Sequence, residues 1–175
     1  MNLLGKKVLL KPLEKDDMEI LHFMINDPDM SNMVVGWSKP ISMVEQERWF
    51  ENLKNDLNIR YAISYNGKTV GCAIIHDIDW KNKSVTLSIK VLKDYCKIGI
   101  GKDTIKTLIE YCFNELNVNR ICAEVLDYNI SSNSLFKSCG FVLEGTKRNA
   151  IYKKGKYNSL NLYSILKEEY NEGNR

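Results

Sequence analysis

The sequence predicts a mixed α/β fold in which helices flank a mostly antiparallel central sheet. Residues 60–78 alternate between apolar and polar positions on both sides of Asn66-Gly67, the pattern of an antiparallel hairpin. Residues 85–126 change from a strand period to a helix period and back, which indicates two parallel strands joined by a helical crossover. The 175 residues contain no linker or repeat, so we expect one domain over 1–175.

The chain is expected to begin with a strand over residues 7–13, followed by a helix that Asp16 or Asp17 caps. Apolar residues at three- and four-residue spacing carry this helix to Asp27, and Pro28 marks its end.

An irregular connection is expected over residues 29–40. It holds more apolar side chains than a loop usually exposes, Trp37 among them. Ser42 and Glu45 then form the pattern of a capping box, which predicts a helix to about residue 56.

A glycine-bearing turn at residues 96–102 joins the strand at 85–91 to the helix that ends near 116. Glycine lets the backbone approach a ligand closely, and amides that open a helix have no intrahelical acceptor. Together with the helix dipole they attract a phosphate or pyrophosphate. The residues predicted to form this site are Lys97, Ile98, Gly99, Ile100, Gly101 and Lys102.

The remaining elements follow from alternation and turn residues. They are a strand over 120–126, a helix over 131–139 that stops at Gly140, an antiparallel pair over 141–147 and 156–166, and a tail over 167–175 that begins as a helix.

Two motifs resemble those of the GNAT superfamily of acetyl-CoA-dependent N-acetyltransferases. Val91, Gly99 and Gly101 keep the spacing of its central motif, although Cys96 stands where Arg or Gln is usual. Residues 129–141 resemble its closing segment, an asparagine followed by a short helix and Gly-Phe. The likeness is greatest to the branch that holds ribosomal-protein N-terminal, spermidine and amino-sugar acetyltransferases.

The resemblance implies a GNAT-type sheet whose two parallel strands splay apart around the pantetheine arm of acetyl-CoA. In that arrangement the arm pairs with backbone near Ile89 and Val91, and Asn129 holds it. Phe136 would pack beside the thioester, and Lys137 would face the nucleotide end.

The resemblance also implies a catalytic base. Glu124 matches the strand glutamate assigned as base in ribosomal-protein alanine acetyltransferases, and its apolar neighbours are expected to desolvate it. The alternative is a structural hydrogen bond or ion pair. His76, Asp77 and Asp79 are the substitutes, and Asp77 with Trp37 is also expected to bind substrate.

The tyrosine that usually protonates the leaving thiolate is Phe136 in this chain. We expect Ser134 to take this role, with Ser132, Tyr128 or water as alternatives. A thiol, with a reference pKa near ~8.5, can also leave without a dedicated acid.

Composition limits the partners and the compartment. A net charge of +3 with scattered basic residues leaves no nucleic-acid footprint, and the first charged residue comes too early for a signal peptide. No apolar run is long enough to span a membrane. Five cysteines without a CxxC pair or a metal-binding cluster fit reduced thiols, so we expect a cytoplasmic protein with no metal. A homodimer is left open.

The sequence therefore predicts an N-acetyltransferase that uses acetyl-CoA and a small-molecule or peptide amine in a direct attack. No cysteine lies in a nucleophile constellation, which argues against an acyl-enzyme. The acceptor is left open among polyamines, protein N-termini, amino sugars and other small metabolites. A non-catalytic acetyl-CoA-binding or interaction protein of the same fold is the alternative, since Phe136, Cys96 and Thr86 depart from the catalytic pattern. A nucleotide-binding module is less consistent with the chain, because it lacks the Lys-Ser/Thr of a P-loop and the triple glycine of a dinucleotide site.

Overall fold

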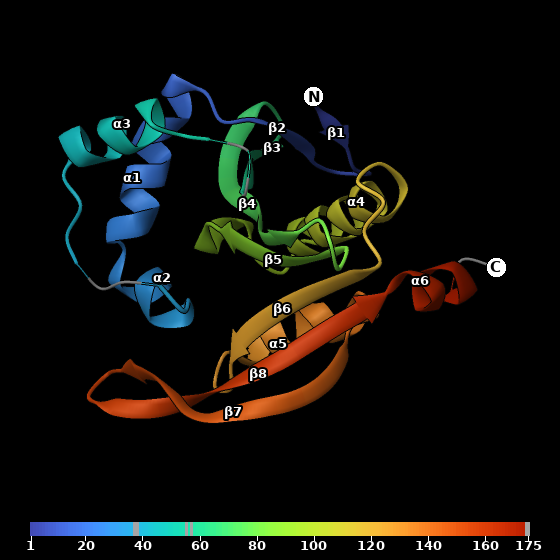
Figure 1. Cartoon of the computed structure of the whole chain (residues 1–175). Helices are drawn as coiled ribbons and strands as arrows, with labels where there is room; N and C mark the ends of the chain where they lie inside the picture. Colours follow the sequence, from blue (N-terminus) through green and yellow to red (C-terminus); the bar gives the residue numbers. More distant parts are fainter. Residues whose placement is uncertain (37–38, 55, 57, 174–175) are drawn as a thin grey trace.

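The computed structural model describes residues 1–36, 39–54, 56 and 58–173. In this part of the chain eight strands form one sheet in the order β1-β2-β3-β4-β5-β6-β8-β7 (Figure 1). The strands are β1 (Leu3–Leu4), β2 (Leu9–Pro12), β3 (Ile59–Tyr65), β4 (Lys68–Asp79), β5 (Ser84–Val91), β6 (Arg120–Leu126), β7 (Val142–Lys153) and β8 (Lys156–Leu166). The helices are α1 (Met18–Asn26), α2 (Pro28–Met33), α3 (Met43–Glu51), α4 (Ile100–Asn114), α5 (Ile130–Ser138) and α6 (Lys167–Gly173), with short 3-10 turns η1 (Lys15–Asp17) and η2 (Lys93–Tyr95). The predicted mixed, mostly antiparallel sheet is confirmed.

The parallel pair β5 and β6 is joined over only part of its length. Backbone partners run from Ser84 with Arg120 to Thr86 with Cys122, and the two strands then diverge, as Figure 1 shows. Beyond Thr86 each strand is paired on its outer side only, β5 with β4 and β6 with β8. The splay implied by the resemblance is therefore present.

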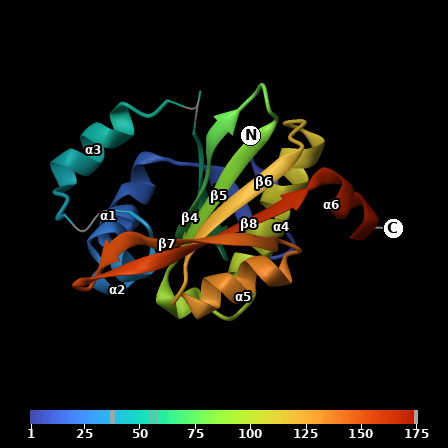
Figure 2. The same cartoon turned by 60° about the horizontal axis from the view of Figure 1, so that its bottom comes forward.

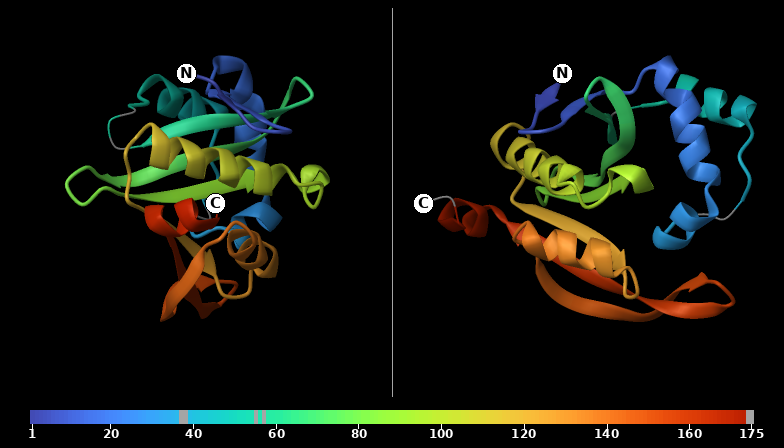
Figure 3. Two further views of the ribbon diagram at one scale, coloured as in Figure 1. Left: turned by 90° about the vertical axis from the view of Figure 1, so that its right-hand side faces the viewer. Right: turned by 180° about the vertical axis from the view of Figure 1, so that it is seen from behind.

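The two faces of the sheet carry different helices. The buried stripe of α4 packs on the face that bears Ala73, Ile75 and Leu87. In the right-hand view of Figure 3, α4 and α5 lie in front of the strands. On the opposite face α1 packs through Met18, Leu21 and Met24 against a smaller cluster that includes Cys72. The main core thus lies under α4, and the face toward α1 remains only partly covered.

Most elements agree with the sequence prediction, including the hairpin at Asn66-Gly67 and the capping box of Ser42 and Glu45. Strand β1 was not predicted, and α3 ends at Glu51 rather than near residue 56.

The predicted irregular connection after residue 28 is wrong in its first part, which forms α2. Asp27 caps this helix, because its Oδ1 accepts hydrogen bonds from Asp29 N at 2.7 Å and Met30 N at 3.1 Å. Pro28 occupies the first helical position, where its missing N–H costs nothing. Proline therefore begins α2 as well as ending α1.

Asp17, one of the two predicted caps, occupies the N-cap position of α1, but its side chain makes no capping hydrogen bond there. Its buried carboxylate instead accepts hydrogen bonds from Lys11 Nζ, Thr69 Oγ1 and the backbone amide of Glu14. Asp17 thereby ties η1 to β2 and β4.

No helix among the described residues is both long enough and apolar enough to cross a membrane.

Candidate active site

A cavity of about 1030 Å³ follows the gap between β5 and β6. Its walls come from β3, β4, β5 and β6, from the turn before α4, from the start of α5, and from α2 with the residues after it. The cavity therefore connects the predicted phosphate site to the partly covered face of the sheet.

At one end of the cavity α4 begins with free amides. Gly99 is the N-cap, with φ of +92°, a conformation that favours glycine. The first intrahelical bond is made by Asp103 N to Gly99 O at 3.0 Å, so the N–H groups of Ile100, Gly101 and Lys102 precede it. A Cβ on Gly101 would lie 3.2 Å from Leu135, so a side chain there would narrow the cavity.

The N-terminal residues hold this end of α4 in place. The carboxylate of Asp103 accepts hydrogen bonds from the amides of Lys6, Lys7 and Val8 at 3.1, 2.6 and 3.0 Å. Lys7 also donates from Nζ to Ile98 O at 2.8 Å. The backbone that faces the cavity is thus fixed from behind, a role for residues 6–8 that the sequence analysis did not include.

Most of the predicted cofactor residues line the cavity, namely Ile89, Val91, Lys97, Gly99, Gly101, Lys102, Asn129 and Phe136. Three others do not. Ile98 is exposed, Ile100 is buried in the core, and Lys137 lies on the exposed face of α5. The side chains of these three residues therefore point away from the cavity, and Ile98 and Ile100 retain only their backbone beside it.

Ser134, the predicted acid, is also exposed and does not line the cavity. At about 100° per residue, the inward face of α5 passes through positions 131, 132, 135 and 136, and 134 falls on the other side. The α5 hydroxyls that do line the cavity belong to Ser131 and Ser132. The prediction of Ser134 is therefore wrong, because this residue lies on the face of α5 that points away from the cavity.

Glu124 lines the cavity, but the expected desolvation is not found. Its side chain is 39% exposed, and its Oε1 lies 2.8 Å from Lys147 Nζ. The alternative of an ion pair is therefore present.

A second titratable group lies on the cavity wall at the end of β4. His76 Nε2 is 2.8 Å from Ser88 Oγ, and His76 Nδ1 is 2.9 Å from Asp77 Oδ2. Because a carboxylate can only accept, Nδ1 carries the proton toward Asp77, which leaves Nε2 of the neutral ring to accept from Ser88. The β4–β5 register shifts between His76 and Asp79, and Asp77 has φ of +50°. Such a bulge redirects side chains.

Asp77 and Asp79 themselves do not line the cavity. The Asp77 side chain is 75% exposed, and the Asp79 carboxylate binds Asn82. Trp37, the other predicted substrate residue, lies outside the described residues.

Across the cavity, three side chains bind consecutive carbonyls at the end of α2. Tyr128 Oη donates to Asn32 O at 2.5 Å, Asn129 Nδ2 to Met33 O at 2.8 Å, and Lys153 Nζ to Ser31 O at 2.9 Å. Figures 1 and 2 both show the tip of the β7–β8 hairpin, which carries Lys153, beside α2. We refer to Tyr128, Asn129 and Lys153 as the carbonyl clamp, since helix-terminal carbonyls otherwise lack partners.

The clamp changes the interpretation of Asn129. Besides its bond to Met33 O, its Oδ1 accepts from Ser132 N at 3.1 Å and thereby caps α5. Both ends of the Asn129 side chain thus have structural partners. Lys153 also donates to Gly36 O at 2.8 Å, and burial together with Lys90 lowers the pKa of Lys153.

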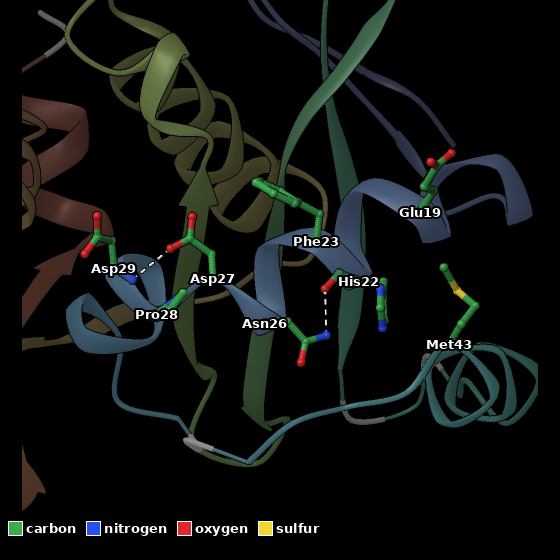
Figure 4. Close-up of a pocket in the computed structure, with 8 residues that line it drawn as sticks. All are labelled: Glu19, His22, Phe23, Asn26, Asp27, Pro28, Asp29 and Met43. Atoms are coloured by element: carbon green, nitrogen blue, oxygen red, sulfur yellow. Dashed lines mark hydrogen bonds between the residues drawn. The ribbon is translucent and has the colours of Figure 1, made fainter.

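A second cavity, of about 700 Å³, lies between α1 and the starts of α2 and α3 (Figure 4). It is lined by Glu19, His22, Phe23, Asn26, Asp27, Pro28, Asp29 and Met43, most of them exposed. His22 Nε2 and Asn26 Nδ2 lie 2.7 and 2.9 Å from Ile41 O, so these two side chains hold the chain before α3. None of the predicted site residues lies here.

No group of three or more metal-binding side chains is found among the residues that the structure describes.

Comparison with known proteins gives one family and several relatives. The profile of the acetyltransferase (GNAT) domain matches residues 10–162. An uncharacterised N-acetyltransferase of Bacillus licheniformis is 27% identical over 94% of this chain and 96% of its own length. A Bacillus subtilis protein named "Putative ribosomal N-acetyltransferase" is 34% identical over 66% of this chain and 63% of its own length.

The fold has a solved counterpart. The crystal structure of spermidine N-acetyltransferase from Vibrio cholerae with CoA and spermine superposes with a TM-score of 0.87 at 21% identity, over 95% of this chain and 99% of that one.

Proposed function

Because the chain belongs to the GNAT acetyltransferase family, it is an N-acetyltransferase that uses acetyl-CoA, and we propose that the cavity between β5 and β6 is its active site. The proposal rests on one observation: the diverging strands β5 and β6 and the free amides at the start of α4 line the same cavity. The proposed substrate is a primary amine, which attacks the thioester directly.

The residues present fit the acetyl donor. The amides of Ile100, Gly101 and Lys102 would bind its pyrophosphate, with Lys97 beside them. The unpaired side of β5 near Ile89 would accept and donate the hydrogen bonds of the pantetheine arm, as a neighbouring strand does.

We propose His76 as the general base, acting through Ser88. Both side chains line the cavity and are already hydrogen-bonded, so a proton from the amine can pass by way of the Ser88 hydroxyl to His76 Nε2. Glu124 is the second candidate, less favoured because its carboxylate is paired with Lys147.

The leaving thiolate needs no residue of its own in this proposal, since its reference pKa near ~8.5 makes it a good leaving group. Ser132, which lines the cavity, is the α5 hydroxyl that we propose in place of Ser134.

Calorimetric titration with acetyl-CoA tests the site. We expect the parent chain to bind and Gly101→Glu, whose side chain would enter the cavity beside Ile89 and Leu135 at the free amides, to lose binding by at least about 30-fold. Gly67→Glu is the control, because it adds the same side chain in the β3–β4 turn, where no atom lies within 4 Å of its Cβ. Equal loss in both variants, or no binding by the parent chain, would contradict the proposal.

We further propose that the whole chain works as one domain in the cytoplasm. All five cysteines are free thiols, which supports a reducing compartment. A homodimer is supported by Val142 and Leu143, large apolar side chains exposed on the edge strand β7. Light scattering after gel filtration distinguishes the dimer from a monomer.

A further inference from the structure

A row of three side chains crosses the sheet from the proposed reaction centre to the far end of the cavity. Arg60 of β3 pairs with Ile74 of β4, and Ile74 pairs with Ser88 of β5. All three side chains line the cavity. Since neighbouring strands are ~4.8 Å apart, the backbone of Arg60 lies roughly 10 Å from that of Ser88, on the side away from the splay.

Arg60 is held in this position by packing instead of by a carboxylate. It is half-buried, and its guanidinium carbon lies 5.7 Å from the ring centre of Trp49 in α3. The side-chain hydrogen bond that it makes within the described part of the chain, from Nη1 to Asn58 O, is long at 3.5 Å. Within the described residues Arg60 has no ion-pair partner, although a partly desolvated charge is normally paired. Burial lowers the pKa of its guanidinium group.

A second cation lies on the same face. Lys90 pairs across the strands with Cys72, which is two positions before Ile74 on β4, so Lys90 lies on the same face of the sheet as Ile74 and Arg60. Lys90 lines the cavity and, like Arg60, forms no ion pair with any residue that the structure describes.

The carboxylates around the cavity do not neutralise this face. Asp27 uses its carboxylate to cap α2, and Glu124 is paired with Lys147. Asp29 is exposed on α2, across the cavity from the sheet. The sheet side of the acceptor end therefore carries uncompensated positive charge, which attracts an anion and repels a polycation.

We infer that the acceptor is an amine that also carries an anionic group, a carboxylate or a phosphate, and that Arg60 binds this group while the amine faces Ser88. The planar fork of a guanidinium matches both anions in a bidentate geometry. The inference rests on the proposed function, because it assigns the substrate class of that same cavity.

Matched acceptor pairs test it. The panel consists of L-alanine against L-alaninamide, glucosamine 6-phosphate against glucosamine, and spermidine as a polycation, with release of CoA as the readout. We expect the anionic member of at least one pair to have a KM about 10- to 100-fold lower than its neutral partner. The pair that responds distinguishes the carboxylate from the phosphate.

Variants assign the effect to one residue. Arg60→Gln should raise the KM of the preferred anionic acceptor by about 10- to 100-fold, with the KM values of its neutral partner and of acetyl-CoA unchanged. Arg60→Lys, which keeps the charge without the fork, should give an intermediate KM. Arg148→Gln removes an equal charge from the exposed part of β7, away from the cavity, and should change neither KM.

The outcomes separate this inference from the proposed function. Turnover of amines without preference for an anion, or best turnover of spermidine, would overturn the inference and leave the proposed function standing. Binding of acetyl-CoA without turnover of any amine in the panel would overturn both. An unchanged KM in a folded Arg60→Gln variant would remove Arg60 from acceptor binding.

Discussion

The imidazole of His76 and the hydroxyl of Ser88 are hydrogen-bonded across β4 and β5, with His76 Nε2 2.8 Å from Ser88 Oγ. The bond connects the exposed carboxylate of Asp77 to the wall of the cavity between β5 and β6. A proton accepted inside the cavity therefore has a path to solvent.

Replacement of either residue should slow the reaction without loss of cofactor binding. We expect His76→Gln to lower kcat by about 100-fold or more and Ser88→Ala by about 10-fold, because a positioned base contributes on that scale. Steady-state kinetics and acetyl-CoA calorimetry measure the two effects separately. Asp79→Asn, outside the cavity, is the control and should keep the parent kcat. A full kcat in His76→Gln would eliminate this base.

Glu124→Gln should change kcat by less than about threefold, because the Glu124 carboxylate is exposed and already occupied by Lys147. Lys147→Gln should have an equally small effect. The same kinetic assay decides between the two bases. A loss in Glu124→Gln as large as that in His76→Gln would transfer the role to Glu124.

Loosening the carbonyl clamp should weaken acceptor binding more than cofactor binding. Tyr128→Phe removes the donor to Asn32 O and should raise the KM of the amine by about 3- to 10-fold while costing about 1 kcal/mol of stability. Kinetics and urea unfolding measure both effects. Tyr157→Phe, on an exposed tyrosine of β8, is the matched control. If the KM of acetyl-CoA rises and that of the amine does not, the clamp does not shape the acceptor wall.

Asp17 should make the free energy of unfolding depend on pH. Burial raises the pKa of Asp17, but the hydrogen bonds from Lys11, Thr69 and the Glu14 amide outweigh burial and hold the pKa below its ordinary value. A carboxyl whose pKa is lower in the folded state stabilises the fold above its unfolded pKa near ~4, and this stabilisation is lost as the pH falls through the folded pKa.

Asp17→Asn should therefore cost about 1 to 3 kcal/mol at pH 7 and much less at a pH below the folded value. Urea unfolding across this range measures the difference. Asp16→Asn, which changes an exposed neighbour, should have no comparable effect. A cost that stays constant with pH would show that the carboxylate contributes by packing instead of by charge.

Local patterns were enough to predict most of the fold. The β3–β4 hairpin, the strand β5 and the helix α4 depend on alternation, on turn glycines and on helical spacing, all of which are properties of short stretches. The glycine-bearing turn before α4 belongs to the same class, because the conformation of Gly99 is a property of its own backbone.

Other features depend on contacts between distant residues. The splay begins where pairing between Thr86 and Cys122 ends, and no local property of either strand marks that position. Ser134 lies close to Phe136 in the sequence, but the face of α5 that meets the cavity is set by packing against α4 and β6. Nothing in the sequence indicates that the side-chain amide of Asn129 donates a hydrogen bond to Met33 O.

Two features had signals that a closer sequence analysis could have used. Asp27 followed by Pro28 is the pattern of an N-cap and a first helical position, which predicts α2. Arg60 alternates with Tyr61 in the predicted hairpin, so its side chain had to lie on the face of the sheet opposite the main core. A charged side chain at that position is a candidate for ligand binding.

The carbonyl clamp also bears on the order in which the molecule folds. Tyr128 and Asn32 are 96 positions apart in the chain, and Lys153 and Ser31 are 122 apart. Contacts of such separation close large loops, and their entropic cost is met only after the two halves of the sheet have formed. The cavity wall that the clamp holds should therefore be the last part of the molecule to assemble, and on heating it should open before the sheet melts.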